Sequence, residues 1–302
     1  MVTAILLTLT VGCLWSLVGV FYKLIAQYKL SVFNISGATN LFSLLVLSGL
    51  CVHKIGALPE MPAPPLWFVL FMLLAGFVNL AGSMMLQRSM IYGRSGVAWS
   101  IGQSSLAVPF VSITLIFGEV WSPFRLGGTA LVLTGLLVLS FRKEADGSAA
   151  ERPQYGIALA LGAFGILGIA QSMMSASSYL PYGDPADTRP VFLLLGGLTA
   201  ILAGKYVVRD HDWRMTRRAW LIVALMALEG VTALYLQFRA LDLLKQHGMN
   251  SIFFPVAVGT SIALYSIWSM AFFREKPDRK IVAGTLAVLA GIALYCLETA
   301  AR

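Results

Sequence analysis

Apolar residues gather in long runs along this chain, and short polar stretches separate the runs. Each run approaches the roughly 20 residues that an α-helix needs to cross the hydrocarbon of a bilayer. The pattern predicts ten such helices, at approximately 2–22, 34–52, 66–87, 95–117, 124–141, 156–179, 190–208, 219–241, 249–273 and 280–297. The connections are too short for a separate soluble domain. The sequence therefore predicts an all-α membrane protein with ten transmembrane helices.

The composition agrees with a membrane protein. Of 302 residues, 58% are hydrophobic and 12% are charged, whereas soluble domains carry about 25% charged residues. Residues 1–23 have no basic start and are too long for the apolar part of a signal peptide, so we expect the first transmembrane helix there. The three cysteines, Cys13, Cys51 and Cys296, have no metal-like spacing and are expected to pack as small apolar side chains.

The net charge of +8 reports topology here, because the basic residues lie in loops and at helix ends. Sixteen of the 22 lysines and arginines fall on one face of the ten-helix arrangement and six on the other. Cytoplasmic loops are enriched in Lys and Arg. We therefore expect a multi-pass protein of the cell inner (plasma) membrane, with both termini on the non-cytoplasmic side and no nucleic-acid partner.

Two segments, 117–140 and 273–296, match at a constant offset of 156 residues. Within each segment two glycines are seven residues apart, which is two helical turns, and small residues at that spacing let another helix approach closely. The register pairs Glu119 with Glu275, Gly128 with Gly284, and Gly135 with Gly291.

Five helices per half is an odd number, so two matching halves must cross the membrane in opposite directions. The loops agree, because residues 118–125 contain one basic residue and residues 274–280 contain four. The sequence predicts two inverted five-helix repeats, 1–145 and 153–302, within one membrane domain.

At these residues the chain resembles the drug/metabolite transporter superfamily, particularly its EamA-type branch. The resemblance rests on Trp15 and Lys23 in the first helix and on the repeated pattern at 118–128 and 274–284. It implies secondary transport by alternating access, with a central cavity between the first four helices of each half. Small multidrug antiporters of the superfamily carry a proton-coupling glutamate in the first helix. The corresponding stretch GCLWSLVGV has no acid, so their mechanism is not expected here.

Polar residues inside the spans are the candidate site. Glu229 lies near the centre of LIVALMALEGVTALYLQF, where a carboxylate costs roughly 2.5–3.5 kcal/mol on insertion scales. An offset of 150 aligns Gln87 with Gln237 and carries Asn79 onto Glu229. We interpret Glu229 as a substrate-binding or proton-coupling group, with a structural hydrogen bond to a neighbouring helix as the alternative.

Trp99 and Gln103 are four residues apart on one helix face, which suits a small polar metabolite that stacks on the ring. Pro109 and Pro255 are expected to bend their helices. Glu119 and Glu275 each precede the last helix of a half, where the helix dipole favours a carboxylate. The complete set of substrate-binding candidates is Glu229, Asn79, Trp99, Gln103, Trp15, Gln171 and Gln237, with Glu229 and Lys23 as gating or coupling candidates.

Competing classes lack their motifs. The sequence has no HExxH, no P-loop and no intramembrane aspartate pair, so we expect neither an enzyme, nor a metal, nor a cofactor. The favoured function is a secondary transporter of a small polar metabolite, coupled to a proton or a counter-substrate, as a monomer or homodimer. A sugar or polyol uptake carrier and a non-transporting scaffold are the alternatives.

Overall fold

The computed structural model describes residues 1–28, 30–57, 63–92, 95–140, 153–182, 187–208, 213–273 and 279–301, which are helical with short connections and contain no strand. The helices are α1 (Val2–Gln27), α2 (Val32–Ala57), α3 (Leu66–Tyr92), α4 (Ser95–Gln103), η1 (Ser104–Leu106), α5 (Ala107–Phe117), α6 (Pro123–Ser140), α7 (Pro153–Ala176), α8 (Arg189–Val208), α9 (Arg217–Gln246), η2 (Asn250–Ile252), α10 (Phe253–Phe273) and α11 (Arg279–Ala301). Glu275 and most of its loop lie outside the described residues.

Nine of the described helical stretches are long and apolar enough to cross a membrane, with α4, η1 and α5 together forming one of them. The tenth apolar helix, Pro123–Leu139, is shorter. Many large apolar side chains along these helices are exposed, as expected for surfaces that face lipid. The chain is a multi-pass membrane protein, and a helix is found at each of the ten predicted positions.

The two prolines occupy the same local position, although at different depths. A three-residue 3-10 turn, η1 or η2, precedes a helix in which the third residue is Pro109 or Pro255. A proline in the first turn of a helix removes a backbone N–H that would have no partner within that helix. At Pro109 the α-helix changes to a 3-10 turn within a membrane span, since α4 and α5 meet at η1, and the predicted bend stays a prediction. For Pro255 the predicted bend is wrong, because this residue lies at the start of α10.

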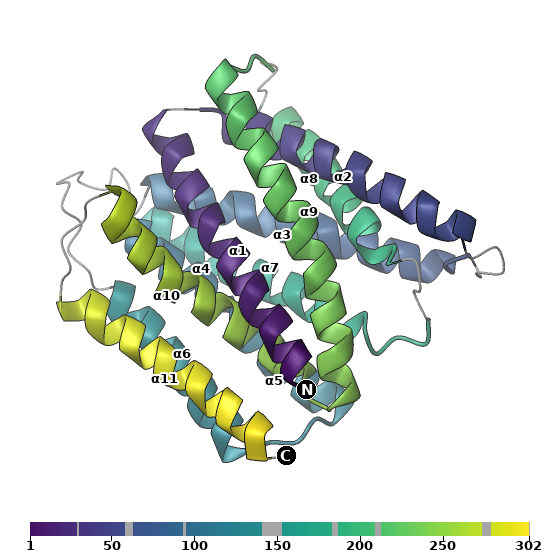
Figure 1. Ribbon diagram of the computed structural model, residues 1–302. Coiled ribbons are helices and arrows are strands. Elements are labelled where there is room, and N and C mark those ends of the chain that lie inside the picture. The colour runs from purple at the N-terminus through teal and green to yellow at the C-terminus, as the bar shows by residue number, and fades with distance from the viewer. Residues whose placement is uncertain are drawn as a thin grey trace.

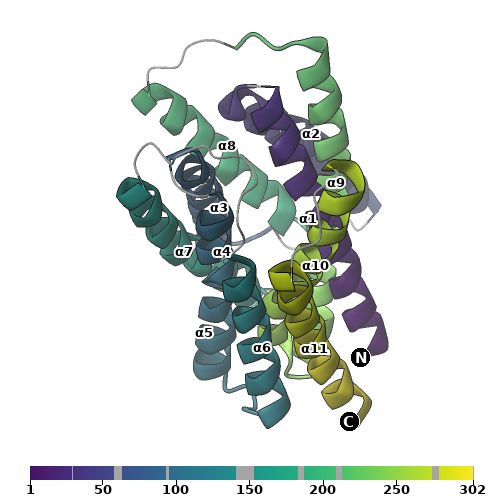
Figure 2. The same ribbon diagram turned by 90° about the vertical axis from the view of Figure 1, so that its left-hand side faces the viewer.

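Both termini lie at one end of the bundle, which we call the terminal face; the other end is the opposite face (Figure 1). α1 contacts α9 and α10, and α3 contacts α7 and α8. α2 contacts α8 and α9, α7 contacts α4 and α5, and α6 packs along α11 (Figure 2). Helices from the first and second halves of the chain therefore interleave throughout.

The predicted glycine packing is confirmed between α6 and α11. A Cβ atom built on Gly135 would lie 2.6 Å from the Gly284 carbonyl oxygen, and one on Gly284 would lie 2.9 Å from that of Gly135. Gly128 and Gly291 face each other in the same way, at 3.0 and 2.6 Å. The four glycines thus allow direct backbone contact at two levels of one antiparallel helix pair.

Candidate functional site

Glu229 lies on α9 and is buried, with 8% of its surface exposed. Nearby, the Ser43 hydroxyl of α2 donates to the Ala227 carbonyl oxygen at 3.4 Å, so this part of α9 packs against helices as well as lipid. The Oε1 atom of Glu229 has no hydrogen-bond partner within the described part of the chain. Buried polar atoms are almost always paired, and an unpaired one costs about 1–3 kcal/mol. Glu229 therefore carries a buried oxygen atom without a partner among the described residues.

Tyr22 of α1 is the polar side chain with an electrostatic influence from Glu229. Its phenol also approaches the Gln87 amide of α3. Both amide atoms of Gln87 are buried without a hydrogen-bond partner among the described residues. The phenol of Tyr22 on α1 is thus near the Glu229 carboxyl of α9 and, separately, near the Gln87 amide of α3. These three groups offer hydrogen-bond donors and acceptors to a small polar ligand.

Two predicted residues, Gln171 of α7 and Gln237 of α9, form hydrogen bonds between helices. The Gln171 side-chain oxygen accepts a hydrogen bond from the Ser105 hydroxyl of η1 at 3.3 Å. The Gln237 amide donates to the Met174 sulfur at 3.4 Å and is 1% exposed. These contacts connect α7 to η1 and to α9.

The two predicted tryptophans pack against apolar side chains. The Trp15 ring lies 6.1 Å from Phe253, edge to face, and 6.2 Å from Phe254, stacked. Trp99 packs beside Leu86 and its neighbours, and its indole Nε1 is buried without a partner among the described residues. Trp99 therefore keeps an unused donor inside the bundle.

The remaining predicted residues are half-buried. Gln103 is the last residue of α4, next to the break at η1. Asn79 accepts the Ser83 hydroxyl at its main-chain carbonyl, at 2.9 Å. Lys23 follows Tyr22 near the end of α1.

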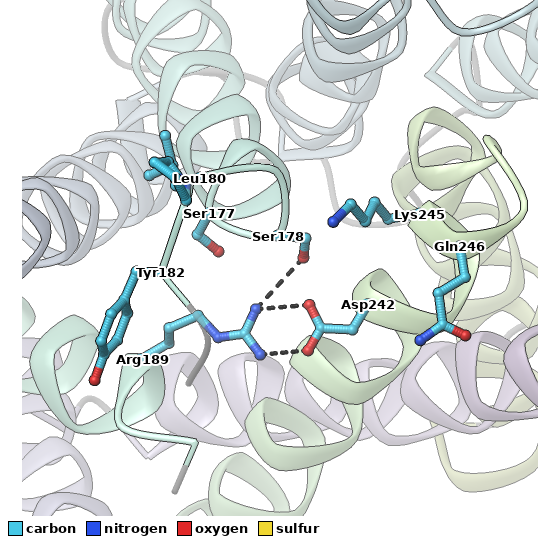
Figure 3. Close-up of a pocket in the computed structure, with 9 residues that line it drawn as sticks. Ser177, Ser178, Leu180, Tyr182, Arg189, Asp242, Lys245 and Gln246 are labelled. Atoms are coloured by element: carbon cyan, nitrogen blue, oxygen red, sulfur yellow. Dashed lines mark hydrogen bonds and ion pairs between the residues drawn. The ribbon is translucent and has the colours of Figure 1, made fainter. Parts of the chain in front are cut away.

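A cavity of about 410 Å³ opens at the terminal face. Its centre is the ion pair between Arg189, the first residue of α8, and Asp242 near the end of α9 (Figure 3). The guanidinium donates to both carboxylate oxygens, at 2.8 and 2.5 Å, and a third contact reaches the Ser178 hydroxyl at 3.4 Å. The walls are Ser177, Ser178, Leu180, Pro181, Tyr182, Arg189, Asp242, Lys245 and Gln246.

Glu119 has the structural role that the sequence predicts, but at another helix. Its carboxylate accepts the backbone N–H groups of Asn250 (2.6 Å) and Ser251 (3.1 Å), so it caps η2 and α10 and does not cap α6. The Tyr179 hydroxyl also donates to Glu119, and burial together with this bond raises the pKa of Tyr179. The expectation that α6 is the helix concerned is wrong, because the cap is formed between segments 131 residues apart.

Sequence reasoning missed Tyr22 and the Arg189–Asp242 pair. Tyr22 lies among the aromatic residues common in membrane helices, and nothing in its spacing separates it from them. Arg189 and Asp242 are 53 residues apart, and both are near predicted helix ends where charges are usual. Glu229 was among the predicted site residues because a carboxylate within an apolar run stands out, whereas Gln87 entered only through its alignment with Gln237.

No protein-family model matches the sequence, and no curated protein matches it either. Among solved structures, 28 chains match. One of them, described only as a crystal structure of a protein, superposes with a TM-score of 0.73 at 16% identity, over 98% of this chain and 97% of that one. This likeness shows that the chain shares its fold with a solved structure of nearly the same length.

Proposed function

We propose that this chain is a secondary transporter that moves a small polar metabolite across the membrane by alternating access. We place it in the drug/metabolite transporter superfamily, EamA-type branch, with its central site between two inverted repeats. The observation that carries this proposal is the buried Glu229 carboxyl within a membrane span, with one oxygen unpartnered in the described chain. An ionisable group within a membrane span marks a substrate or proton pathway by default.

The helix contacts support the inverted repeats. Exchanging α1 with α7, α2 with α8 and α3 with α9 converts the α1–α9 contact into α7–α3, and α2–α9 into α8–α3, and all four contacts are present. The α2–α8 pair maps onto itself under this exchange, and so does α6–α11 when α6 is exchanged with α11. Such a contact pattern is expected when two repeats are related by an axis in the membrane plane.

The chemistry of Tyr22, Gln87 and Glu229 suits ligands with hydroxyl or amino groups. The amide of Gln87 donates and accepts, the phenol of Tyr22 does both, and the carboxyl of Glu229 accepts when ionised and donates when protonated. An amino-acid-like metabolite and a sugar or polyol both fit these groups, so both substrate classes are tested. Because the opposite face carries most of the basic residues, we place it in the cytoplasm.

The test is uptake into proteoliposomes of a panel of amino acids, sugars and polyols, with and without an imposed pH gradient. Glu229→Gln keeps the size of the side chain but removes the titratable group, and we expect gradient-driven uptake to fall at least tenfold. Thr232→Val is the matched control, because Thr232 lies one turn away on the exposed side of α9. It should transport normally.

Gradient dependence that persists in Glu229→Gln would remove this residue from the coupling mechanism. If the folded wild-type protein moves no member of the panel under either condition, the scaffold alternative is favoured. Preference within the panel separates the amino-acid-like class from the sugar class.

A further inference from the structure

Two lysines make matching contacts at opposite ends of the α2–α8 pair. Lys54, near the end of α2, places its Nζ atom 2.8 Å from Oδ2 of Asp187, just before α8 begins. Lys205, near the end of α8, places its Nζ atom 2.5 Å from Oδ1 of Asn34, near the start of α2. The two helices are antiparallel neighbours, so each lysine connects the end of its own helix to the beginning of the other.

Each lysine is also held over an aromatic ring from the region of α9. Lys54 lies 4.8 Å from the centre of the Tyr235 ring, and Lys205 lies 3.9 Å from that of Trp213. The two lysines are 151 residues apart and their acceptors 153, close to the repeat offsets of 150 and 156 in the sequence. The two contacts are therefore counterparts in the two halves, one at each face.

The contact at the terminal face is ionic and tightly constrained. Asp187 has a left-handed backbone (φ 53°), which Asp tolerates better than most residues. Its carboxylate also lies 3.7 Å from Arg189, and its carbonyl accepts the Cys51 thiol at 3.5 Å. Cys51 is buried, with 8% of its surface exposed.

The contact at the opposite face uses a neutral acceptor and is more deeply buried. Lys205 and Asn34 are 4% and 3% exposed. The Asn34 amide also donates to the Arg214 carbonyl oxygen at 3.3 Å, which joins the start of α2 to the segment before α9. Both ends of the helix pair are thus tied, but with different chemistry.

Between the two ends the helices approach closely. A Cβ atom on Gly197 of α8 would lie 3.0 Å from the side-chain oxygen of Asn40 of α2. Small residues at such a crossing permit close contact between rigid helices. Because α2 and α8 touch between their ends, the two helices can separate at one end while the other end stays closed.

We infer that the Lys54–Asp187 and Lys205–Asn34 contacts are two alternating latches. Opening of the terminal face breaks the first while the second holds, and opening of the opposite face does the reverse. This inference rests on the proposed alternating-access function, but it concerns the conformational equilibrium and can be measured without a substrate.

Cys51 is a native reporter of the terminal-face latch. We would measure its rate of maleimide labelling in lipid nanodiscs, where both faces are accessible, after replacing Cys13 by Ser and Cys296 by Ala. Asp187→Asn, which retains a residue that tolerates the left-handed backbone, should raise the rate about fivefold, the effect expected for losing a partly exposed ion pair. Lys205→Met weakens the distant latch and should lower the rate by a similar factor.

The discriminating result is the lower labelling rate in Lys205→Met, because Lys205 lies at the other end of the helix pair from Cys51. A higher rate in Asp187→Asn could also come from local exposure of Cys51. Arg217→Gln removes an exposed positive charge at the same face as Lys205 and should leave the rate unchanged. If Lys205→Met does not fold, Asn34→Ala removes the acceptor in its place and should also lower the rate. If the folded Lys205→Met or Asn34→Ala variant is labelled at an unchanged or raised rate, the two contacts are not alternating latches, even if transport is observed. If the labelling rates are as expected but no transport is found, only the proposed function is refuted.

Discussion

Replacing Gly135 by alanine should force α6 and α11 apart. The new methyl carbon would lie 2.6 Å from the Gly284 carbonyl oxygen, whereas ordinary contacts begin at 3.4 Å, so the backbones must separate by about 0.8 Å. Overpacking of a well-packed contact costs about 1–3 kcal/mol. Alanine also gains up to about 1 kcal/mol over glycine in a helix. The net change in the free energy of unfolding should therefore be a loss of up to about 2 kcal/mol.

Gly165→Ala on α7 is the matched control. A Cβ atom at Gly165 would have no neighbour within 4 Å, so only the helix preference acts and this variant should be as stable as the wild type or slightly more stable. The free energy of unfolding can be compared for both variants by titration with denaturing detergent, followed by circular dichroism. The double variant Gly135→Ala/Gly284→Ala should cost less than the sum, because both methyl groups act on one contact. Equal stability of Gly135→Ala and Gly165→Ala would refute direct backbone contact at this level.

Two further predictions concern buried polar side chains. Arg125 is 1% exposed and donates to Glu298 at 3.1 and 3.3 Å, while the Ser122 hydroxyl also donates to Glu298 at 2.8 Å. Arg125→Met should therefore leave a buried carboxylate without its cationic partner and lower the free energy of unfolding by about 3–5 kcal/mol. A loss below about 1 kcal/mol, in the same detergent titration, would contradict this. Gln237 donates a weak hydrogen bond to the Met174 sulfur. Gln237→Leu should therefore change the free energy of unfolding by less than about 1 kcal/mol. We expect proteoliposome uptake by this variant to be unchanged. Lost uptake at unchanged stability would instead assign Gln237 to the substrate site.

The glycine contact between α6 and α11 was predictable because the glycine spacing is a local pattern that occurs twice in the sequence. Glycines seven residues apart mark one face of a helix, and their recurrence in 117–140 and 273–296 points to one shared use. The partner helix did not follow from spacing alone. Gly128 faces Gly291 and Gly135 faces Gly284 because the two helices are antiparallel, which the coordinates establish.

The candidate site was predictable only in part. Glu229 is a polar residue within an apolar run, and the penalty for placing it in hydrocarbon makes it visible. Gln171 and Gln237 met the same criterion, yet they contact Ser105 and Met174. A polar residue in a membrane helix signals that it has a partner or a ligand, but not which of the two.

By itself the sequence determined that this chain is a set of membrane-crossing helices. An apolar run of bilayer length must satisfy its own backbone hydrogen bonds in lipid, and a helix does so without any tertiary contact. Only the tertiary structure decided which faces meet, because lipid is as apolar as the protein interior and leaves no contrast between buried and exposed sides of a helix. The ion pair of Lys54 with Asp187, and the hydrogen bond of Gln237 with Met174, depend on the tilt and rotation of helices far apart in the chain.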